Sequence, residues 1–230
     1  MKRVLLWLVA VIVLGGIITG GYFYWRSRQV TPSPSQPFNL LILGDSIAQG
    51  VGSVENDNTL ETYITDSLRP RYGEFTSENK AVPGSKTEDV LNDQLTKLQR
   101  EHYAALVIFI GTNDITHLVI PSKFEANYDA IAKILTAKAD VVVLANIPQF
   151  SNTPIVPKSI QSIADYRTRS YNNKIDNIAN SYSNMRMFNF YSFSQNRLHG
   201  ETDYIGQDGF HPNDEGYKLI GEEIVQKILN

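Results

Sequence analysis

The chain has 230 residues, of which 42% are hydrophobic and 20% charged, and it contains no cysteine. This length suits one sizeable domain rather than two, and the lack of cysteine excludes a disulfide framework and an N-terminal lipid-modified cysteine. Residues 1–37 hold four of the 21 basic side chains and no acidic one, so residues 38–230 carry 17 basic and 24 acidic side chains. A domain with this net charge of −7 is not suited to bind nucleic acid or to adhere to anionic lipid by charge.

The first predicted element is a transmembrane helix over residues 4–25, an apolar run without a single charge. At about 1.5 Å rise per residue such a helix is roughly 33 Å long, which matches the hydrocarbon core of a bilayer. A cleaved signal peptide is the main alternative, but its apolar region is normally shorter and ends at a small-residue cleavage site that this sequence lacks. A buried core helix is a further alternative, although so long an apolar run at one end of a chain favours an anchor. We therefore predict an uncleaved membrane anchor over residues 1–26.

Residues 27–37, SRQVTPSPSQP, are rich in proline and serine and are predicted to form an extended linker. Two basic residues precede the apolar run and two follow it, so the positive-inside rule hardly decides its orientation. N-terminal anchors with this layout usually leave the following domain outside the cytoplasm. We expect a single-pass protein of the cell membrane, with its helix in the lipid bilayer and an extracellular domain over residues 38–230.

Short apolar runs alternate with helical patterns throughout residues 38–230. Near-continuous apolar strands separated by helices are typical of a parallel sheet with helices on both faces. We expect strands over residues 40–43, 74–81, 104–110, 141–147 and 185–190, the second being the weakest. We expect helices over residues 60–68, 87–100, 124–139, 160–182 and 215–229.

Polar residues that could take part in catalysis follow several of these strands. Ser46 follows the first strand in GDSIAQG, Gly84 follows the second in AVPGSKT, and Asn113 follows the third in GTND. Asp208 and His211 lie in DGFHPND, in the last loop before the C-terminal helix. Because ligands of such folds bind beyond the carboxyl ends of the strands, we expect these residues to gather at one rim.

These residue types are the parts of an acyl-transfer site. Ser46 can act as a nucleophile once His211 accepts its proton, and Asp208 is close enough in sequence to orient the imidazole. The backbone N–H groups of Ser46 and Gly84 and the side-chain amide of Asn113 are candidate donors for an oxyanion hole. Each residue alone has an ordinary explanation, such as a helix cap for Ser46 and turn chemistry for Gly84 and Asn113. The combination in this order favours catalysis.

With these four motifs in this order, the sequence resembles the GDSL family of lipases and esterases, also called SGNH hydrolases, over nearly all of residues 38–230. The resemblance implies a flavodoxin-like three-layer α/β/α sandwich with a five-stranded parallel sheet. It also implies Ser46 as nucleophile, His211 as base and then acid, Asp208 as the residue that orients His211, and an oxyanion hole of Ser46, Gly84 and Asn113. No metal and no cofactor are expected.

Other site types fit the sequence less well. A phosphate-binding loop requires a lysine after its second glycine, which GDSIAQGVG lacks, and an α/β-hydrolase requires G-x-S-x-G at its nucleophile. A metal-dependent phosphoesterase could use Asp45, Asp114, Asp208 and His211, but the chain has only four histidines and none in a D-x-H or H-x-H pair. The non-enzymatic alternative is a catalytically inactive module of the same fold that binds envelope components.

The prediction is therefore a membrane-anchored serine ester hydrolase that works through an acyl-enzyme. Its substrates would be lipid acyl esters or O-acetylated carbohydrate of the cell envelope, and nucleic acid is not expected as a partner. The sequence does not indicate the length of the acyl chain or the nature of the alcohol.

Overall fold

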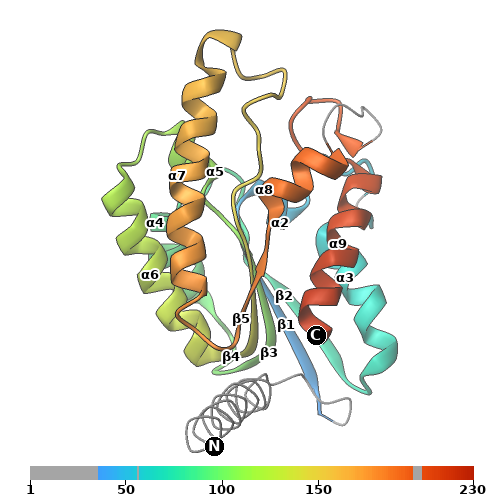
Figure 1. Cartoon of the computed structure of the whole chain (residues 1–230). Coiled ribbons are helices and arrows are strands. Elements are labelled where there is room, and N and C mark those ends of the chain that lie inside the picture. Colours follow the sequence, from blue (N-terminus) through green and yellow to red (C-terminus); the bar gives the residue numbers. More distant parts are fainter. Residues whose placement is uncertain (1–35, 56, 199–203) are drawn as a thin grey trace, which may run out of the picture. The chain divides into compact units, whose positions relative to one another are not determined.

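The computed structural model describes residues 36–55, 57–198 and 204–230, and Figure 1 shows how their helices and strands are arranged. Five strands form a sheet in the order β2-β1-β3-β4-β5, and each neighbouring pair is parallel. The predicted five-stranded parallel sheet is confirmed, with the strand order of flavodoxin-like folds. The strands are β1 (Phe38–Gly44), β2 (Phe75–Asn79), β3 (Tyr103–Phe109), β4 (Ala139–Ala145) and β5 (Met185–Phe188).

The three central strands are formed by the strongest apolar runs. β1, β3 and β4 share one burial pattern, in which only the second residue is partly exposed. Their side chains are removed from water on both faces of the sheet, which explains why these runs are continuous rather than alternating. The edge strands β2 and β5 are shorter and partly exposed. The strands predicted over residues 74–81 and 185–190 are therefore shorter than expected.

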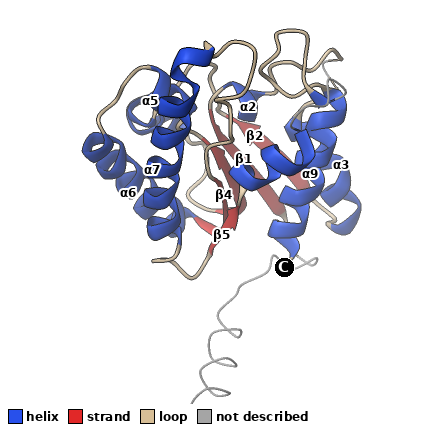
Figure 2. Cartoon of the chain, turned by 45° about the horizontal axis from the view of Figure 1, so that its top comes forward, coloured by secondary structure: helices blue, strands red, loops and turns tan. Residues whose placement is uncertain are grey.

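Helices cover both faces of the sheet, as Figure 1 and Figure 2 show, which confirms the expected α/β/α layers. One hydrophobic core lies between the sheet and α3, α8 and α9, and the other lies between the sheet and α6 and α7. The longer helices are α3 (Leu60–Leu68), α6 (Pro121–Lys138), α7 (Gln161–Ala179) and α9 (Asp214–Leu229). The short helices are α2 (Ser46–Gln49), α4 (Thr87–Asp89), α5 (Thr112–Thr116) and α8 (Phe190–Phe193).

The helix predicted over residues 87–100 is irregular. α4 continues into a π-helical turn, η2 (Val90–Gln94), and then into a 3₁₀ turn, η3 (Leu95–Lys97). Val90 lies in the core, as the amphipathic pattern predicts, but Gln94 is also buried, with 1% of its surface exposed. π-Helical turns often occur at functional sites, and this one directs a polar side chain toward β1.

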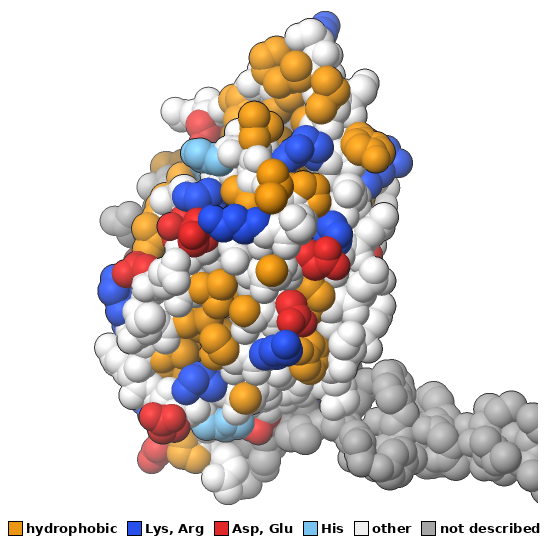
Figure 3. Space-filling view, turned by 90° about the vertical axis from the view of Figure 1, so that its left-hand side faces the viewer, with side chains coloured by type: hydrophobic (Ala, Val, Ile, Leu, Met, Phe, Trp, Pro, Cys, Tyr) orange, Lys and Arg blue, Asp and Glu red, His pale blue; other side chains and the backbone are white. Residues whose placement is uncertain are grey.

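The outer face of α6 and α7 combines charged and apolar side chains (Figure 3). Ion pairs such as Lys123–Glu88, at 2.8 Å, are exposed, and each contributes at most about 1 kcal/mol. Hydrophobic side chains gather at the upper end of this face. The large exposed apolar residues around the starts of α6 and α7 are Leu118, Ile120, Ile155, Ile160, Ile163 and Tyr166. The surface near the carboxyl ends of the strands is therefore apolar on this side.

The transmembrane helix predicted over residues 4–25 and most of the predicted linker lie outside the described residues. Within the ranges that are described, no helix is both long and apolar enough to cross a bilayer.

Candidate active site

A tight turn joins β1 to α2 and carries the predicted nucleophile. Gly44 has a φ of +133°, and a Cβ built on it would lie 1.9 Å from the carbonyl oxygen of Phe109, so only glycine allows β1 to approach β3 in this way. Asp45 is the N-cap of α2, because its Oδ1 accepts a hydrogen bond of 3.1 Å from the Ile47 N–H. The helix-cap interpretation of Ser46 is therefore wrong. Ser46 is the first residue of α2, and its hydroxyl forms a different contact.

That contact is with His211, which reaches Ser46 from the loop before α9. His211 Nε2 lies 2.8 Å from Ser46 Oγ, and His211 Nδ1 lies 2.6 Å from Asp208 Oδ2. The other carboxylate oxygen of Asp208 accepts hydrogen bonds of 2.9 Å from the backbone N–H groups of Phe210 and His211. With Nδ1–H donated to the carboxylate, Nε2 is the nitrogen that can accept the serine proton. The three residues thus form one continuous hydrogen-bonded row.

The Asp208 carboxylate is held in its ionised form. Partial burial acts to raise its pKa, but the hydrogen bonds from the His211 ring and from the backbone of His211 and Phe210 together hold the pKa below its ordinary value. Asp208 therefore stays negative at neutral pH, where it can stabilise the imidazolium that forms when His211 takes up a proton.

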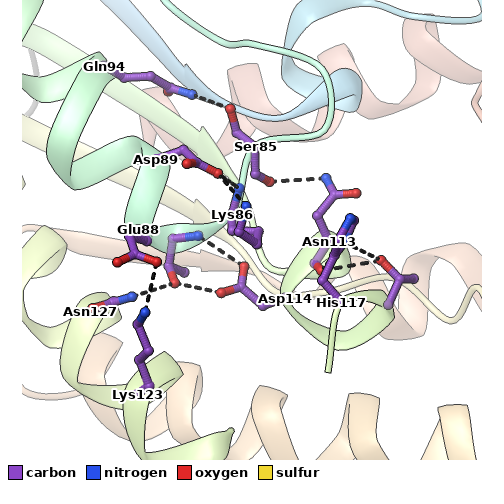
Figure 4. A network of polar contacts seen from close by, with 12 residues as sticks. Ser85, Lys86, Glu88, Asp89, Gln94, Asn113, Asp114, His117, Lys123 and Asn127 are labelled. Carbon is purple, nitrogen blue, oxygen red and sulfur yellow. Dashed lines mark hydrogen bonds and ion pairs between the residues drawn. The ribbon is translucent and has the colours of Figure 1, made fainter. Parts of the chain in front are cut away.

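The predicted oxyanion donors lie around Ser46 at the carboxyl end of the sheet. Val82 N–H donates to the Gly44 carbonyl oxygen at 3.1 Å, which holds the loop of Gly84 beside the end of β1. Asn113, on α5, donates from Nδ2 to the carbonyl oxygen of Ser85 at 3.0 Å, so it lies against the same loop (Figure 4). The second Nδ2 hydrogen of Asn113 is not needed for this bond. The five predicted site residues therefore meet at one end of the sheet.

Gly84 suits a donor role because of its backbone conformation. Its φ is +82°, and a Cβ built on it would have no atom within 4 Å. The space beside it is open, and no described residue accepts a hydrogen bond from its N–H. An exposed N–H in an open position can bind an oxygen atom of a ligand.

Residues 42–219 match the GDSL-like Lipase/Acylhydrolase family. The chain belongs to this family. No match is found among curated proteins. The fold is similar to that of Axe2, an acetylxylan esterase from Geobacillus stearothermophilus, at 17% identity and a TM-score of 0.68, covering 85% of this chain and 96% of that one. It is also similar to that of a lipase/acylhydrolase from Enterococcus faecalis, at 22% identity and a TM-score of 0.63, covering 84% of this chain and 95% of that one. A third similar structure is the esterase EstA from Pseudoalteromonas sp., at 19% identity and a TM-score of 0.64, covering 83% of this chain and 96% of that one.

The aspartate of the GTND motif of this GDSL protein, Asp114, supports the segment that follows Gly84. Asp114 is fully buried, and its two oxygens accept hydrogen bonds from the N–H and the hydroxyl of Thr87, at 3.0 and 2.6 Å. Burial raises the pKa of Asp114, while the bonds from Thr87 oppose this effect. Thr87 was not identified from the sequence, because a threonine at the start of a helix carries no distinguishing signal. The pair joins α4 to α5, the helix that also carries Asn113.

The residues considered as metal ligands have protein partners instead. Asp45 accepts from Ile47, Asp114 from Thr87, and Asp208 from His211. Within the described part of the chain, no group of three His, Cys, Asp or Glu side chains could hold a metal ion.

The buried carboxyl of Asp45, in the turn between β1 and α2, should make the stability of the fold depend on pH. Burial, together with the nearby charge of Asp114, raises its pKa to about 7 from 3.8, although the Ile47 N–H acts against the shift. A raised carboxyl pKa stabilises the fold at low pH, and this contribution is lost as the pH rises from about 4 through 7. Asp45→Asn keeps an oxygen for the Ile47 N–H but has no charge. As the pH rises from 4 to 8, we expect the free energy of unfolding of the variant to increase relative to that of the wild type, by at most about 4 kcal/mol. Urea unfolding at both pH values measures this gain, and a difference that does not change with pH would contradict it.

A cavity of about 620 Å³ opens next to the row of Ser46, His211 and Asp208. Ile47, adjacent to Ser46, and Phe210 and Pro212, on either side of His211, form part of its wall. The remaining lining residues are Pro148, Gln149, Phe150, Asn152, Thr153, Pro154, Phe190, Ser194, Leu198, Ile205, Gly206, Gln207 and Gly209. None of these described lining residues is charged, so the cavity is suited to an apolar ligand.

Proposed function

We propose that this GDSL family member is a serine ester hydrolase with Ser46 as nucleophile, His211 as general base and acid, and Asp208 as the residue that orients His211. The observation that carries the proposal is the row of two short contacts, 2.8 Å from Ser46 Oγ to His211 Nε2 and 2.6 Å from His211 Nδ1 to Asp208 Oδ2. A serine hydroxyl becomes a strong nucleophile only when such a base accepts its proton. This function is an ester hydrolysis, which agrees with the family.

The reaction then proceeds through formation and hydrolysis of an acyl-enzyme on Ser46. Ser46 Oγ bonds to the ester carbonyl carbon while its proton passes to His211, and the new negative oxygen is stabilised by the N–H groups of Ser46 and Gly84 and by Asn113. The carbon–oxygen bond to the alcohol breaks, and His211 gives its proton to the departing alcohol. Water attacks the acyl group on Ser46 while His211 takes its proton. When the acid leaves, that proton returns to Ser46.

The cavity favours esters with an apolar acyl chain over acetylated carbohydrate. The cavity wall beside Ser46 is formed by apolar residues such as Ile47, Phe190 and Phe210, and although it includes five polar side chains, none of its described lining residues is charged. The volume of about 620 Å³ is far larger than an acetyl group needs. We therefore propose acyl esters of medium or greater chain length as substrates.

A series of p-nitrophenyl esters from acetate to decanoate tests this substrate class. Each methylene that becomes fully buried contributes about 0.8 kcal/mol, so kcat/KM is expected to rise by up to about fourfold per methylene. Leu198→Trp fills part of the cavity and should reduce the rate for the long esters more than for acetate. Val54→Trp, at an exposed position outside the cavity, serves as the control.

The opposite result would select the alternative. A kcat/KM that is highest for acetate and falls with chain length would contradict the proposal and favour a carbohydrate deacetylase. Comparing methyl hexanoate with hexyl acetate separates the two sides of the ester, because only the first places a long chain on the acyl side. A preference for hexyl acetate would indicate that the cavity binds the alcohol portion of the ester instead.

We also propose that residues 4–25 anchor the protein in the cell membrane, with the hydrolase domain on the outer side. The length and apolar character of this run support the proposal. The full-length protein should stay in the membrane fraction after a high-pH carbonate wash, and protease added to intact cells should remove the domain. Recovery in the wash, or protection from protease, would contradict it.

A further inference from the structure

The side-chain amide of Gln94 binds the backbone just before the nucleophile. Its Oε1 accepts a hydrogen bond from the Gly44 N–H at 2.9 Å, and its Nε2 donates to the Gly44 carbonyl oxygen at 2.7 Å. Gly44 lies two residues before Ser46, and Gln94 is 1% exposed. Both polar groups of the Gly44 backbone are therefore held by one buried side chain.

This side chain also reaches the loop after β2, which carries Gly84. Gln94 Nε2 lies 3.1 Å from Ser85 Oγ, and the carbonyl oxygen of Ser85 accepts from Asn113 Nδ2 at 3.0 Å. Ser85 directly follows Gly84. Figure 4 shows Gln94, Ser85 and Asn113 lying in sequence across this region. One buried amide thus connects the end of β1, just before Ser46, with the loop that carries Gly84 and accepts a hydrogen bond from Asn113.

The topology explains why a side chain is needed at this position. β2 pairs with β1 only as far as Asn79, which lies opposite Ile42. Beyond that point Val82 N–H donates to the Gly44 carbonyl oxygen, but the Gly44 N–H has Gln94 as its partner instead of a strand. Gln94 takes the place of the missing strand, and the π-helical turn η2 places it there.

We propose that Gln94, acting through Ser85, is a positioning residue that fixes the distance between Ser46 and the oxyanion donors Gly84 and Asn113. This inference rests on the proposed ester hydrolysis. An oxyanion hole stabilises the transition state only if its donors lie at hydrogen-bond distance from the developing oxyanion. Loosening the loop should therefore slow the chemical step and have little effect on substrate binding.

Gln94→Met tests the inference, because methionine has a similar size but lacks the amide. Since loss of a whole oxyanion donor lowers kcat by about 10²–10³, we expect partial displacement to lower kcat by about 10–100-fold with KM changed less than about threefold. Ser85→Ala removes only the contact from Ser85 Oγ to Gln94 and leaves the Ser85 carbonyl on Asn113. It should lower kcat by a smaller factor with an unchanged melting temperature, and it covers the case in which Gln94→Met does not fold.

Asn172→Leu is the matched control. The Asn172 amide holds the N–H and carbonyl groups of Ile147, at 2.8 and 2.9 Å, in the same way that Gln94 holds Gly44, and it is similarly buried. It braces the end of β4, which carries no candidate oxyanion donor. Asn172→Leu should lower the melting temperature while kcat falls less than about threefold. An equal loss of kcat in this variant would reduce Gln94 to a general structural role and overturn the inference.

A double-mutant cycle with Asn113→Ala decides whether Gln94 acts through the oxyanion hole. Once Asn113 is gone, Gln94→Met should lower kcat by less than in the wild type, because only its effect through Gly84 remains. Fully multiplicative losses, or a folded Gln94→Met with wild-type kcat, would overturn the inference. Ser46→Ala separates this outcome from failure of the proposed function. If Ser46→Ala retained wild-type activity, the ester hydrolysis through Ser46 would itself be wrong, and this inference with it.

Discussion

Ser46→Ala and His211→Ala are each expected to lower kcat by about 10⁴–10⁶, and the double variant should be hardly slower than either. The reason is that each side chain depends on the other, because the hydroxyl has no base without the imidazole and the imidazole has no nucleophile without the hydroxyl. The contact of 2.8 Å between them is the structural basis of this dependence. Initial rates on p-nitrophenyl butyrate with the full-length protein measure the effect.

The chain provides a matched control for the histidine. His102 Nε2 lies 2.9 Å from Asp140 Oδ1, so it forms a histidine–aspartate pair like that of His211 and Asp208. This pair lies near the starts of β3 and β4, at the end of the sheet opposite Ser46, and has no serine beside it in the described residues. His102→Ala should retain wild-type kcat. If kcat of the Ser46→Ala and His211→Ala double variant fell by the product of the two single losses, the two residues would act independently, which would contradict their dependence on each other.

Gly44→Ala is expected to destabilise the protein by more than about 4 kcal/mol, and so to give little folded protein. A Cβ at Gly44 would lie 1.9 Å from the Phe109 carbonyl oxygen, and its φ of +133° is unfavourable for alanine. Both effects disrupt the contact of β1 with β3 directly before Ser46. Urea unfolding of the purified variant, or its soluble yield if it does not fold, measures the loss.

Gly73→Ala is the control for this prediction. A Cβ at Gly73 would meet no atom within 4 Å, and its φ does not lie in the positive region. We expect a change in stability of less than about 0.5 kcal/mol. If Gly44→Ala unfolded at the same urea concentration as Gly73→Ala, β1 and β3 could not approach each other as closely as the structure shows.

Much of the fold can be predicted from the sequence because the signals are local. The apolar runs that become β1, β3 and β4 are long and continuous, and the helix over residues 60–68 has the predicted ends. The edge strands were less accurately predicted. At the end of β2 the Asn79 side chain accepts from the Ala81 N–H and donates to the Ala48 carbonyl oxygen, at 3.0 Å each, and the contact with Ala48, 31 residues earlier, leaves no pattern in the sequence.

In the candidate site, too, local sequence signals indicate some residues and miss others. Asp208 and His211 are three residues apart, so their pairing could be expected from one loop, and the motifs around Ser46, Gly84 and Asn113 indicated the rest. Gln94 could not be found, because a glutamine in an amphipathic helix normally faces water. Its burial depends on Gly44, 50 residues earlier, and on a π-helical turn that the period of the apolar residues does not predict. The cap of α2 is Asp45 rather than Ser46, a choice that depends on side-chain orientation.

The most direct test of the central claim is the rate at which a fluorophosphonate modifies the full-length protein, followed by intact mass and peptide mapping. The reagent bonds to an activated serine oxygen and releases fluoride. We predict a single adduct on Ser46, no adduct in Ser46→Ala, and labelling at least about 10³-fold slower in His211→Ala. An adduct on another residue, or labelling of His211→Ala at the wild-type rate, would contradict the assignment of Ser46 and His211 as a catalytic pair.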